Sequence, residues 1–446
     1  MKNHYALALV LALSCNILLL HSCTQSPEEE IIQENPFTGP SPWPEIRKER
    51  IKNLLPAAME TAGADAWLII CRENNNDPIA HHIGGENAGG TAVFIFYRAS
   101  DQVKSMVFSP IGEATALADL KIHDEVIPVE RGKSAISDAA AWISEQNFKT
   151  IAVNSSFDNE IADGLSFTQR QTLEKALGNA STSLISADEL IYEWLAVKLP
   201  AEIEIMTKAA ELTAQWQEEA YRQVIPGKST DADVARFLKK KMEAYGVKDG
   251  WSPDQNPNVN SGLDRGHSHS TDKVIMPGDV IQTDFGIRVY DMWVSDIQRF
   301  AYVLREGETT APDSVQYYFE SSIGGNRIAL AAMKPGVLGY QVDKAQRDWM
   351  AERGSEPVMW STGHPVGYVA HDIGPNLGGG LLPDPSVRPT AVKPLKEGML
   401  FAFDGFHAWK VPGGGTKTMS VEETAVVTKD GARYLIEPQS KLILIK

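Results

Sequence analysis

An internal echo constrains the fold of this 446-residue chain more than any other feature. Residues 225–246 and 334–354 each contain Pro-Gly, a turn, an amphipathic helical pattern and a closing glycine, and their helical positions match at an offset of 108. Thr230 has the residue type of a helix N-cap in the first copy. Each copy is followed by a histidine-containing segment and then by a pattern typical of a β-hairpin. The echo therefore predicts two half-domains of like build within residues 199–446.

Both predicted hairpins carry acidic residues where apolar side chains are expected. Asp284 and Asp296 are equidistant from Tyr290, and Asp404 and Glu422 are equidistant from the centre of the second turn. We expect each pair to face each other across its hairpin. Opposed like charges destabilise a strand pair, and burying them without partners costs more. A divalent cation removes both penalties.

Four carboxylates and a neutral imidazole suit two cations about 3.5–4 Å apart, which lower the pKa of a bridging water and supply hydroxide near neutral pH. Oxygen-rich ligation with one histidine favours Mn²⁺, and Co²⁺, Fe²⁺ and Zn²⁺ are compatible with it. The net charge of −16 leaves no basic surplus to neutralise phosphates, so non-specific nucleic-acid binding is not expected.

Residues 45–198 predict a separate α/β domain. Residues 45–63 have the pattern of one amphipathic helix that ends at Gly63, and residues 192–224 predict one long helix with Pro200 near its start. We expect the domain boundary between residues 198 and 199. Apolar and β-branched runs predict strands at residues 64–72, 91–98, 105–110, 125–129 and 150–154.

The N-terminus has the pattern of an exported protein. A short positive region and an apolar run end in Leu-His-Ser before Cys23, which resembles a bacterial lipoprotein cleavage box. The resemblance implies a signal peptide at residues 1–22, lipid on Cys23, a tether at 23–44, and a periplasmic or cell-surface lipoprotein transported across the inner membrane. A plain secretory signal is the alternative. Cys15 would leave with the signal, so Cys71 would have no disulfide partner.

Four segments in order resemble the pita-bread metallopeptidases, above all the Xaa-Pro aminopeptidases and prolidases. They are HSHSTDKVIMPGDVIQTDFG, SDIQR, GHPVGYVAHD and EGMLFAFD…SVEET. The resemblance implies an α+β fold with a creatinase-type N-terminal α/β domain and a C-terminal pita-bread domain of two pseudo-twofold halves. It also implies a dinuclear-metal hydrolase that removes the N-terminal residue from short peptides as an Xaa-Pro aminopeptidase or dipeptidase. We expect a homodimer.

The resemblance assigns five metal ligands. Asp284 and Glu422 would bridge the two cations, Asp296 would bind one of them, and His364 would be the sole imidazole ligand. Asp404 takes the place of the family's glutamate. The missing methylene shortens its reach by roughly 1.5 Å, whereas a metal–ligand bond tolerates about 0.2 Å. We therefore expect either a backbone shift or a weaker metal site at Asp404.

The resemblance also assigns catalytic roles. His267 and His371 would hydrogen-bond the substrate carbonyl and stabilise the tetrahedral intermediate. We expect Glu422 or another metal-ligand carboxylate to pass a proton to the leaving amine. His269 is the alternative to His267. Ser420 stands where the family has an arginine, so a partner of the metal ligands is missing or comes from elsewhere.

Two neighbours of these residues are expected outside the site, although the closeness of His407 to Asp404 leaves a site role open for it. Glu423 is expected to be solvated on the opposite face of its strand, and His407 is expected on the hairpin surface. Two other functions stay open at this point: a metal-free, creatinase-like C–N hydrolase, and a non-catalytic pita-bread binding protein whose site is degraded at Asp404 and Ser420.

Overall fold

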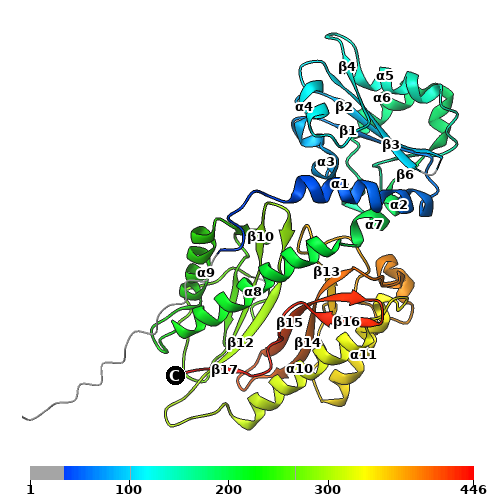
Figure 1. Ribbon diagram of the computed structural model, residues 1–446. Helices are drawn as coiled ribbons and strands as arrows, with labels where there is room; N and C mark the ends of the chain where they lie inside the picture. Colours follow the sequence, from blue (N-terminus) through cyan, green and yellow to red (C-terminus); the bar gives the residue numbers. More distant parts are fainter. Residues whose placement is uncertain (1–34, 101, 267) are drawn as a thin grey trace, which may run out of the picture. The chain divides into compact units, whose positions relative to one another are not determined.

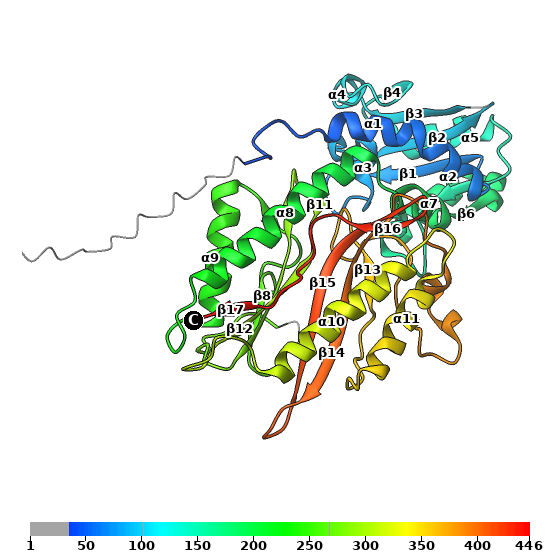
Figure 2. The ribbon, with the colours of Figure 1, turned by 60° about the horizontal axis from the view of Figure 1, so that its bottom comes forward.

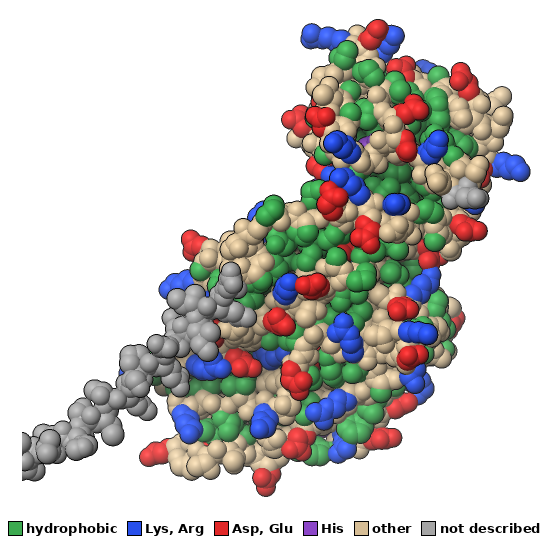
Figure 3. Space-filling model, viewed as in Figure 1, with side chains coloured by type: hydrophobic (Ala, Val, Ile, Leu, Met, Phe, Trp, Pro, Cys, Tyr) green, Lys and Arg blue, Asp and Glu red, His purple; other side chains and the backbone are tan. Residues whose placement is uncertain are grey.

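The computed structural model describes residues 35–100, 102–266 and 268–446 (Figure 1). The expected signal peptide and Cys23 lie outside these residues. Within the described ranges, no helix is both long and apolar enough to cross a membrane. Acidic and basic side chains lie interspersed over the face drawn in Figure 3.

The first part of the described chain is built on a six-stranded mixed sheet in the order β4-β3-β2-β1-β5-β6. All five strands expected from apolar runs are present. Alternate residues of β1 divide between two cores: Leu68 packs with α5 and α6, whereas Trp67 packs with α2 and α7. The elements are α1 Trp43–Asn53, α2 Leu55–Thr61, β1 Ala66–Cys71, α3 Ala80–Ile83, η1 Gly85–Asn87, β2 Ala92–Ala99, β3 Gln102–Pro110, α4 Ala114–Asp119, β4 Glu125–Val129, α5 Ala135–Ser144, β5 Ile151–Val153, η2 Glu160–Ala162, α6 Phe167–Leu177, η3 Gly178–Ser183, β6 Leu184–Ser186 and α7 Asp188–Ala196.

Two helices expected to be continuous are each broken by a proline. The first breaks at Leu54, because Pro56 occupies the first turn of α2 and lacks the N–H that would continue α1. The second breaks between α7 and α8, where Val197 and Leu199 have extended backbone angles before Pro200 begins α8. A residue before proline is disfavoured in the helical region, which explains the extended Leu199.

The second part contains an eight-stranded sheet in the order β13-β14-β15-β12-β9-β8, with β16 and β17 paired to β15 and β12. Helix α8 packs on β12 and β9, and α10 packs on β14 and β15, on one face of the sheet (Figure 2). The elements are α8 Pro200–Arg222, α9 Asp231–Tyr245, β7 Lys248–Asp249, β8 Asn258–Ser261, β9 Val280–Phe285, β10 Ile287–Val289, β11 Trp293–Val294, β12 Ile297–Val303, α10 Asp313–Ala332, α11 Gly339–Glu352, β13 Gly363–Pro365, η4 Pro385–Val387, η5 Pro389–Val392, β14 Leu400–Lys410, β15 Thr416–Thr428, β16 Gly431–Tyr434 and β17 Ile443–Ile445.

The sequence echo corresponds to two halves of like build. Helices α8 and α9 precede strands β8, β9 and β12, and helices α10 and α11 precede β13, β14 and β15. Thr230 caps α9 as expected, since its hydroxyl accepts the Asp233 N–H. Gly246 and Gly354 close the two copies with φ of 65° and 69°, a region that glycine enters without steric cost. The halves join where β12 pairs with β15.

The two hairpins differ in register. In the second, Asp404 lies directly opposite Glu422, as expected. In the first, the expected opposition of Asp284 and Asp296 is wrong: Asp284 pairs with Gln298, and Asp296 lies outside the strands. The ladder is interrupted because Gly286 turns to Asn256, whose side chain bonds both the N–H and the carbonyl of Gly286. Beyond this kink, β10 and β11 continue the hairpin in a separate three-stranded sheet with β7.

Glu202 in the first turn of α8 is fully buried and ties four segments together. Its carboxylate accepts hydrogen bonds from Arg50 at 2.6 Å, Tyr368 Oη at 2.6 Å, Trp293 Nε1 at 3.2 Å and the Leu199 N–H at 2.8 Å. Burial opposes ionisation of Glu202, but Arg50 and the hydrogen bonds hold the pKa of its carboxyl below its usual value. Glu202 therefore joins α8 to α1 through Arg50, and to the loop that follows β13 through Tyr368.

Replacing Glu202 by alanine is expected to lower the free energy of unfolding by about 3–5 kcal/mol, because the substitution leaves the Arg50 guanidinium buried without its partner. Urea denaturation of the purified protein measures this loss. Glu204→Ala on the same helix is the matched control, since Glu204 forms an exposed pair with Lys208 and its loss should leave stability unchanged. Equal losses in the two variants would contradict a structural role for the Glu202 pair.

The stabilisation by Glu202 should also depend on pH. Since the pKa of Glu202 is lowered by folding, its contribution is full above the unfolded pKa of about 4.3 and is lost as pH falls through the folded value. The stability difference between the protein and Glu202→Gln should therefore be largest near neutral pH and shrink in acid. A difference that is constant from pH 7 down to about pH 3 would contradict this.

Candidate metal centre

Four carboxylates and one imidazole meet in a single cavity of about 750 Å³ above the junction of the two half-sheets. Each comes from a different segment: Asp284 from β9, Asp296 from the residue before β12, His364 from β13, Asp404 from β14 and Glu422 from β15. The carboxylates are only 6%, 5%, 7% and 3% exposed, in chain order. The structure therefore brings all five sequence-predicted ligand residues to one cavity; their ligand roles stay predictions.

Three of these residues present ligand atoms close enough for one cation. His364 Nε2 lies 3.8 Å from Asp296 Oδ2 and 4.0 Å from Glu422 Oε1, and the three ligand atoms lie within 4.8 Å of one another. Ligand atoms about 2.0–2.2 Å from one metal ion are roughly 3–4 Å apart, so little movement would be needed. His364 Nδ1 donates to the Pro365 carbonyl at 3.1 Å, which leaves Nε2 facing the carboxylates.

The electrostatics of the cavity also fit a cation. Burial, followed by the neighbouring carboxylates, raises the pKa of Asp296, Asp404 and Glu422 well above their usual values. Among the described residues, Asp404 Oδ1 and Glu422 Oε2 are buried without a hydrogen-bond partner. Buried carboxylate oxygens in this state are costly unless a positive charge meets them. The donor set and its unsatisfied oxygens therefore fit divalent metal ions.

Asp404 stands apart from the three-residue group. It lines the same cavity and lies opposite Glu422 on the ladder, but the group of mutually close ligand atoms found among the described residues consists of Asp296, His364 and Glu422. Its backbone occupies the register that the second hairpin dictates. The expectation of a backbone shift or a weaker metal site at Asp404 therefore stays a prediction.

Neutral side chains occupy the surroundings of Ser420, where the family has an arginine. The Gln298 carbonyl oxygen accepts from Ser420 Oγ at 2.9 Å and from Gln282 Nε2 at 2.7 Å. Burial, followed by the neighbouring carboxylates, outweighs the lowering effect of Gln298 on the pKa of Glu422. Whether a partner of the metal ligands is missing at this position or comes from elsewhere therefore stays open.

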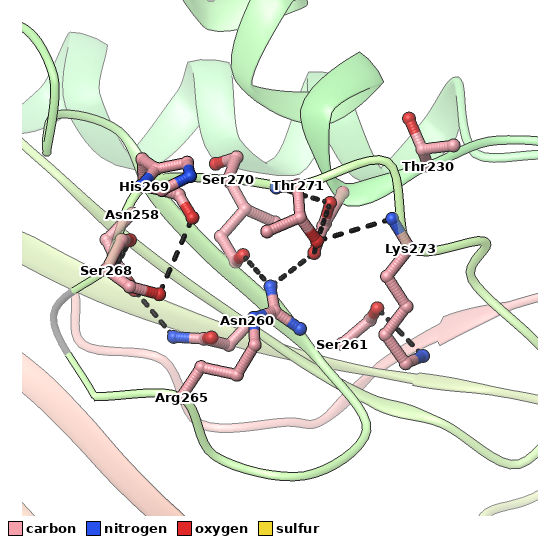
Figure 4. A network of polar contacts seen from close by, with 12 residues as sticks. Thr230, Asn258, Asn260, Ser261, Arg265, Ser268, His269, Ser270, Thr271 and Lys273 are labelled. Atoms are coloured by element: carbon pink, nitrogen blue, oxygen red, sulfur yellow. Dashed lines mark hydrogen bonds and ion pairs between the residues drawn. The ribbon is translucent and has the colours of Figure 1, made fainter.

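The histidines predicted to act on substrate differ in outcome. His371 lines the cavity, and its ring lies 4.2 Å from that of His364 in an edge-to-face arrangement. His267 lies outside the described residues, so its role stays a prediction. His269 is not among the residues that line the cavity. Hydrogen bonds to strand β8 hold the segment that contains His269. The Asn258 amide donates to the Ser268 carbonyl, and Lys273 Nζ donates to Ser261 Oγ (Figure 4).

Two expectations for neighbouring residues were wrong. Glu423 does lie on the opposite face of β15, but it is buried and forms a two-pronged ion pair with Arg299 at 2.8 and 3.1 Å. His407 is also buried; its Nδ1 lies 2.9 Å from Ser321 Oγ, and its ring stacks on Tyr318. Strand alternation predicts the face of Glu423 correctly, but the side chain of Arg299 from the neighbouring β12 meets it there. His407 is covered by Ser321 and Tyr318 of α10.

Sequence reasoning missed the cavity's aromatic and amide lining. Trp251, Trp360, Gln282 and Gln298 all line it. Gln298 stands inside the recognised SDIQR motif, so its proximity to Asp296 could have been anticipated. No signal marks Trp251 or Trp360, because each reaches the cavity from a loop.

The chain has the pita-bread fold, with a cavity lined by four carboxylates and one imidazole. The model of metallopeptidase family M24 matches residues 204–429, and the chain belongs to this family.

Relatives and solved structures extend the similarity over most of the chain. An Xaa-Pro dipeptidase of Pyrococcus horikoshii is 26% identical over 405 residues, which cover 90% of this chain and 100% of the relative. The structures of dipeptidase PepE from Mycobacterium ulcerans and of an X-Pro aminopeptidase from Thermotoga maritima superpose with TM-scores of 0.67 and 0.65. Each is 22% identical to this chain. The superpositions cover 91% and 87% of this chain, respectively, and 100% of each of the other two chains. At this identity the structures establish the pita-bread fold.

Manganese should raise the melting temperature of the protein if the cavity binds it. At a hundredfold excess over the dissociation constant, binding adds about 2.7 kcal/mol to the folded state. His364→Ala should remove most of this shift, because it deletes the imidazole of the three-ligand group. His371→Ala, which deletes a neighbouring imidazole of the same cavity, is the matched control and should keep it. Differential scanning calorimetry with and without Mn²⁺ makes the comparison, and equal shifts in both variants would contradict the assignment.

Asp404→Glu is expected to raise the number of metal ions bound per chain, because the longer side chain restores about 1.5 Å of reach. Asp404→Asn, which keeps the shape but removes the charge, should lower it. Mass spectrometry of metal after gel filtration measures both. If the Asp404→Glu protein binds no more metal than the parent, the short side chain does not weaken metal binding.

Proposed function

We propose that this protein is a metal-dependent exopeptidase that removes the N-terminal residue from short peptides, with Xaa-Pro peptides as its preferred class. The observation that carries the proposal is the three-ligand group of Asp296, His364 and Glu422. It lies in a cavity where, among the described residues, Asp404 Oδ1 and Glu422 Oε2 are buried without a hydrogen-bond partner. Membership of metallopeptidase family M24 and similarity to an Xaa-Pro dipeptidase support it.

The five cavity residues would hold two divalent cations, with manganese preferred because the donors are mainly oxygens. When bound, the cations supply a Lewis acid and hydroxide near neutral pH. His371, at the cavity wall, would hydrogen-bond the substrate carbonyl and stabilise the charge that develops there, together with His267. Glu422 or another ligand carboxylate would take the proton that the attacking water loses and pass it to the leaving amine.

The cavity suits a small substrate. Its volume of about 750 Å³ is within the range of ligand sites that take small molecules. The long connection between residues 374 and 395 contributes Gly374, Asn376 and Thr390 to its wall. This connection, together with Trp360, would limit how far a peptide can extend on both sides of the scissile bond.

We also propose that the enzyme is an exported lipoprotein held by lipid on Cys23, and that it is a homodimer. The first rests on the cleavage-box pattern and the polar tether after it, and the second on the resemblance to the pita-bread peptidases. Palmitate labelling that persists in a Cys23→Ser protein would contradict the anchor, and a monomer mass in light scattering would contradict the dimer.

Activity should require metal. Residues 24–446, loaded with Mn²⁺, are expected to cleave Xaa-Pro dipeptides and tripeptides, and excess chelator should reduce the rate at least a hundredfold, because the carboxylates then have no Lewis acid to hold. Release of the N-terminal amino acid, followed by chromatography, measures both. Cleavage unaffected by the chelator would favour a creatinase-like hydrolase. No cleavage, with less than one metal ion per chain, would favour a binding protein.

A further inference from the structure

The strand that carries His364 receives little support from the sheet. β13 has three residues and lies at the edge of the eight-stranded sheet, where it pairs with β14. An isolated bridge joins Gly363 of this strand to Leu377. Pro365, the last residue of β13, has no N–H to donate. Since a metal–ligand distance tolerates an error of about 0.2 Å, a further constraint is needed to hold His364.

Asp343 of α11 supplies such a constraint. This carboxylate is buried, and its Oδ1 accepts hydrogen bonds from the Thr362 N–H at 3.1 Å and from the Thr362 hydroxyl at 2.7 Å. Thr362 directly precedes β13, and its carbonyl accepts the Asp404 N–H at 2.7 Å. The other oxygen of Asp343 accepts the Gly380 N–H at 2.8 Å. Asp343 therefore fixes the start of β13 and, through Gly380, the long connection that borders the cavity.

Arg347, one turn further along α11, extends the same support to the segment before β13. Its Nε donates to Asp343 Oδ1 at 3.1 Å. Its two terminal nitrogens donate to the carbonyl of Val358 at 2.7 Å and to the carbonyl of Trp360. Residues 355–362 form neither helix nor strand, and polar backbone groups in such a segment depend on partners from elsewhere. The ion pair on α11 thus holds the segment that leads into β13.

The pair is suited to fixing positions rather than to adding net stability. A buried ion pair loses by desolvation about as much as it gains by attraction, so it is weak evidence for stability. Asp343 and Arg347 are 2% and 7% exposed, and their other hydrogen bonds go to the two segments beside the cavity. Neither side chain lines the metal cavity. Their influence on the metal centre therefore passes through Thr362 into β13.

We propose that Asp343 and Arg347 are positioning residues that hold His364 in the metal centre. The inference rests on the proposed metal-dependent function. His364 Nε2 lies 3.8 Å from Asp296 Oδ2 and 4.0 Å from Glu422 Oε1, so a shift of β13 changes the distances that a shared cation requires. Removing a partner that orients a metal ligand typically lowers metal affinity by about 10–100-fold.

The test is a calorimetric titration of the metal-free protein with Mn²⁺. Asp343→Asn keeps the shape of the side chain, but it has no charge to pair with Arg347 and only one oxygen to accept hydrogen bonds. It should weaken Mn²⁺ binding at least about tenfold. Thr362→Val removes only the hydroxyl bond and should weaken binding about fivefold, whereas Thr362→Ser keeps the hydroxyl and should retain the affinity. Asp348→Asn is the matched control, because Asp348 forms an exposed pair with Lys344 at the same spacing on α11; its affinity should be unchanged.

The outcomes separate this role from a structural one and from the proposed function. A pair that only stabilises the fold would lower the melting temperature of metal-free Asp343→Asn and leave the Mn²⁺ affinity of the folded variant at the parent value, which would overturn the inference. Circular dichroism verifies the fold. If Asp343→Asn does not fold, the Thr362 variants decide, and equal affinities of Thr362→Val and Thr362→Ser overturn the inference.

Activity of the parent protein completes the separation. A parent that binds Mn²⁺ but cleaves no Xaa-Pro peptide overturns the proposed function, and the affinities of the variants still decide the positioning role. A parent that binds no Mn²⁺ overturns both.

Discussion

The mutual repulsion of four buried carboxylates is the constraint around which the second part of the chain is organised. They meet where the two half-sheets join, and their joint burial raises the pKa of Asp296, Asp404 and Glu422. On the opposite face of the same strands, Arg299 and Glu423 form a buried ion pair that ties β12 to β15. The two faces of the sheet therefore have different roles. One face presents the carboxylates to the cavity, and the ion pair on the other face holds together the strands that carry them.

Local pattern predicts much of this arrangement. The echo predicts the two halves, and a symmetric turn predicts that Asp404 faces Glu422. The first hairpin defeats the same reasoning, because its kink depends on Asn256, a residue far from it in the sequence. Strand alternation also cannot predict burial. It predicts the face on which Glu423 lies, but the arginine that pairs with Glu423 there, Arg299, comes from the other half-domain. A symmetric turn predicts which acids face each other across a hairpin. Where a residue distant in the sequence distorts the hairpin, as in the first one, that prediction fails.

The loop that carries the histidines is held from outside the half-domain that contains it. Tyr368, between His364 and His371, donates to Glu202, which also pairs with Arg50 of α1. Lys198 lies 3.1 Å from Asp372, the residue after His371. No sequence motif marks these contacts, because they join segments separated by more than 140 residues. The order of the cavity wall therefore depends on residues that precede the family's matched region, which begins at residue 204.

Whether these carboxylates hold metal is decided by anomalous diffraction from crystals grown with Mn²⁺. Two peaks about 3.5–4 Å apart, in contact with Asp296, His364 and Glu422 and bridged by Asp284, are expected in the cavity. A weaker peak beside Asp404 would be in keeping with its shorter side chain. A cavity without anomalous density at saturating Mn²⁺, or Mn²⁺ bound only elsewhere on the protein, would contradict the metal centre and the exopeptidase that depends on it.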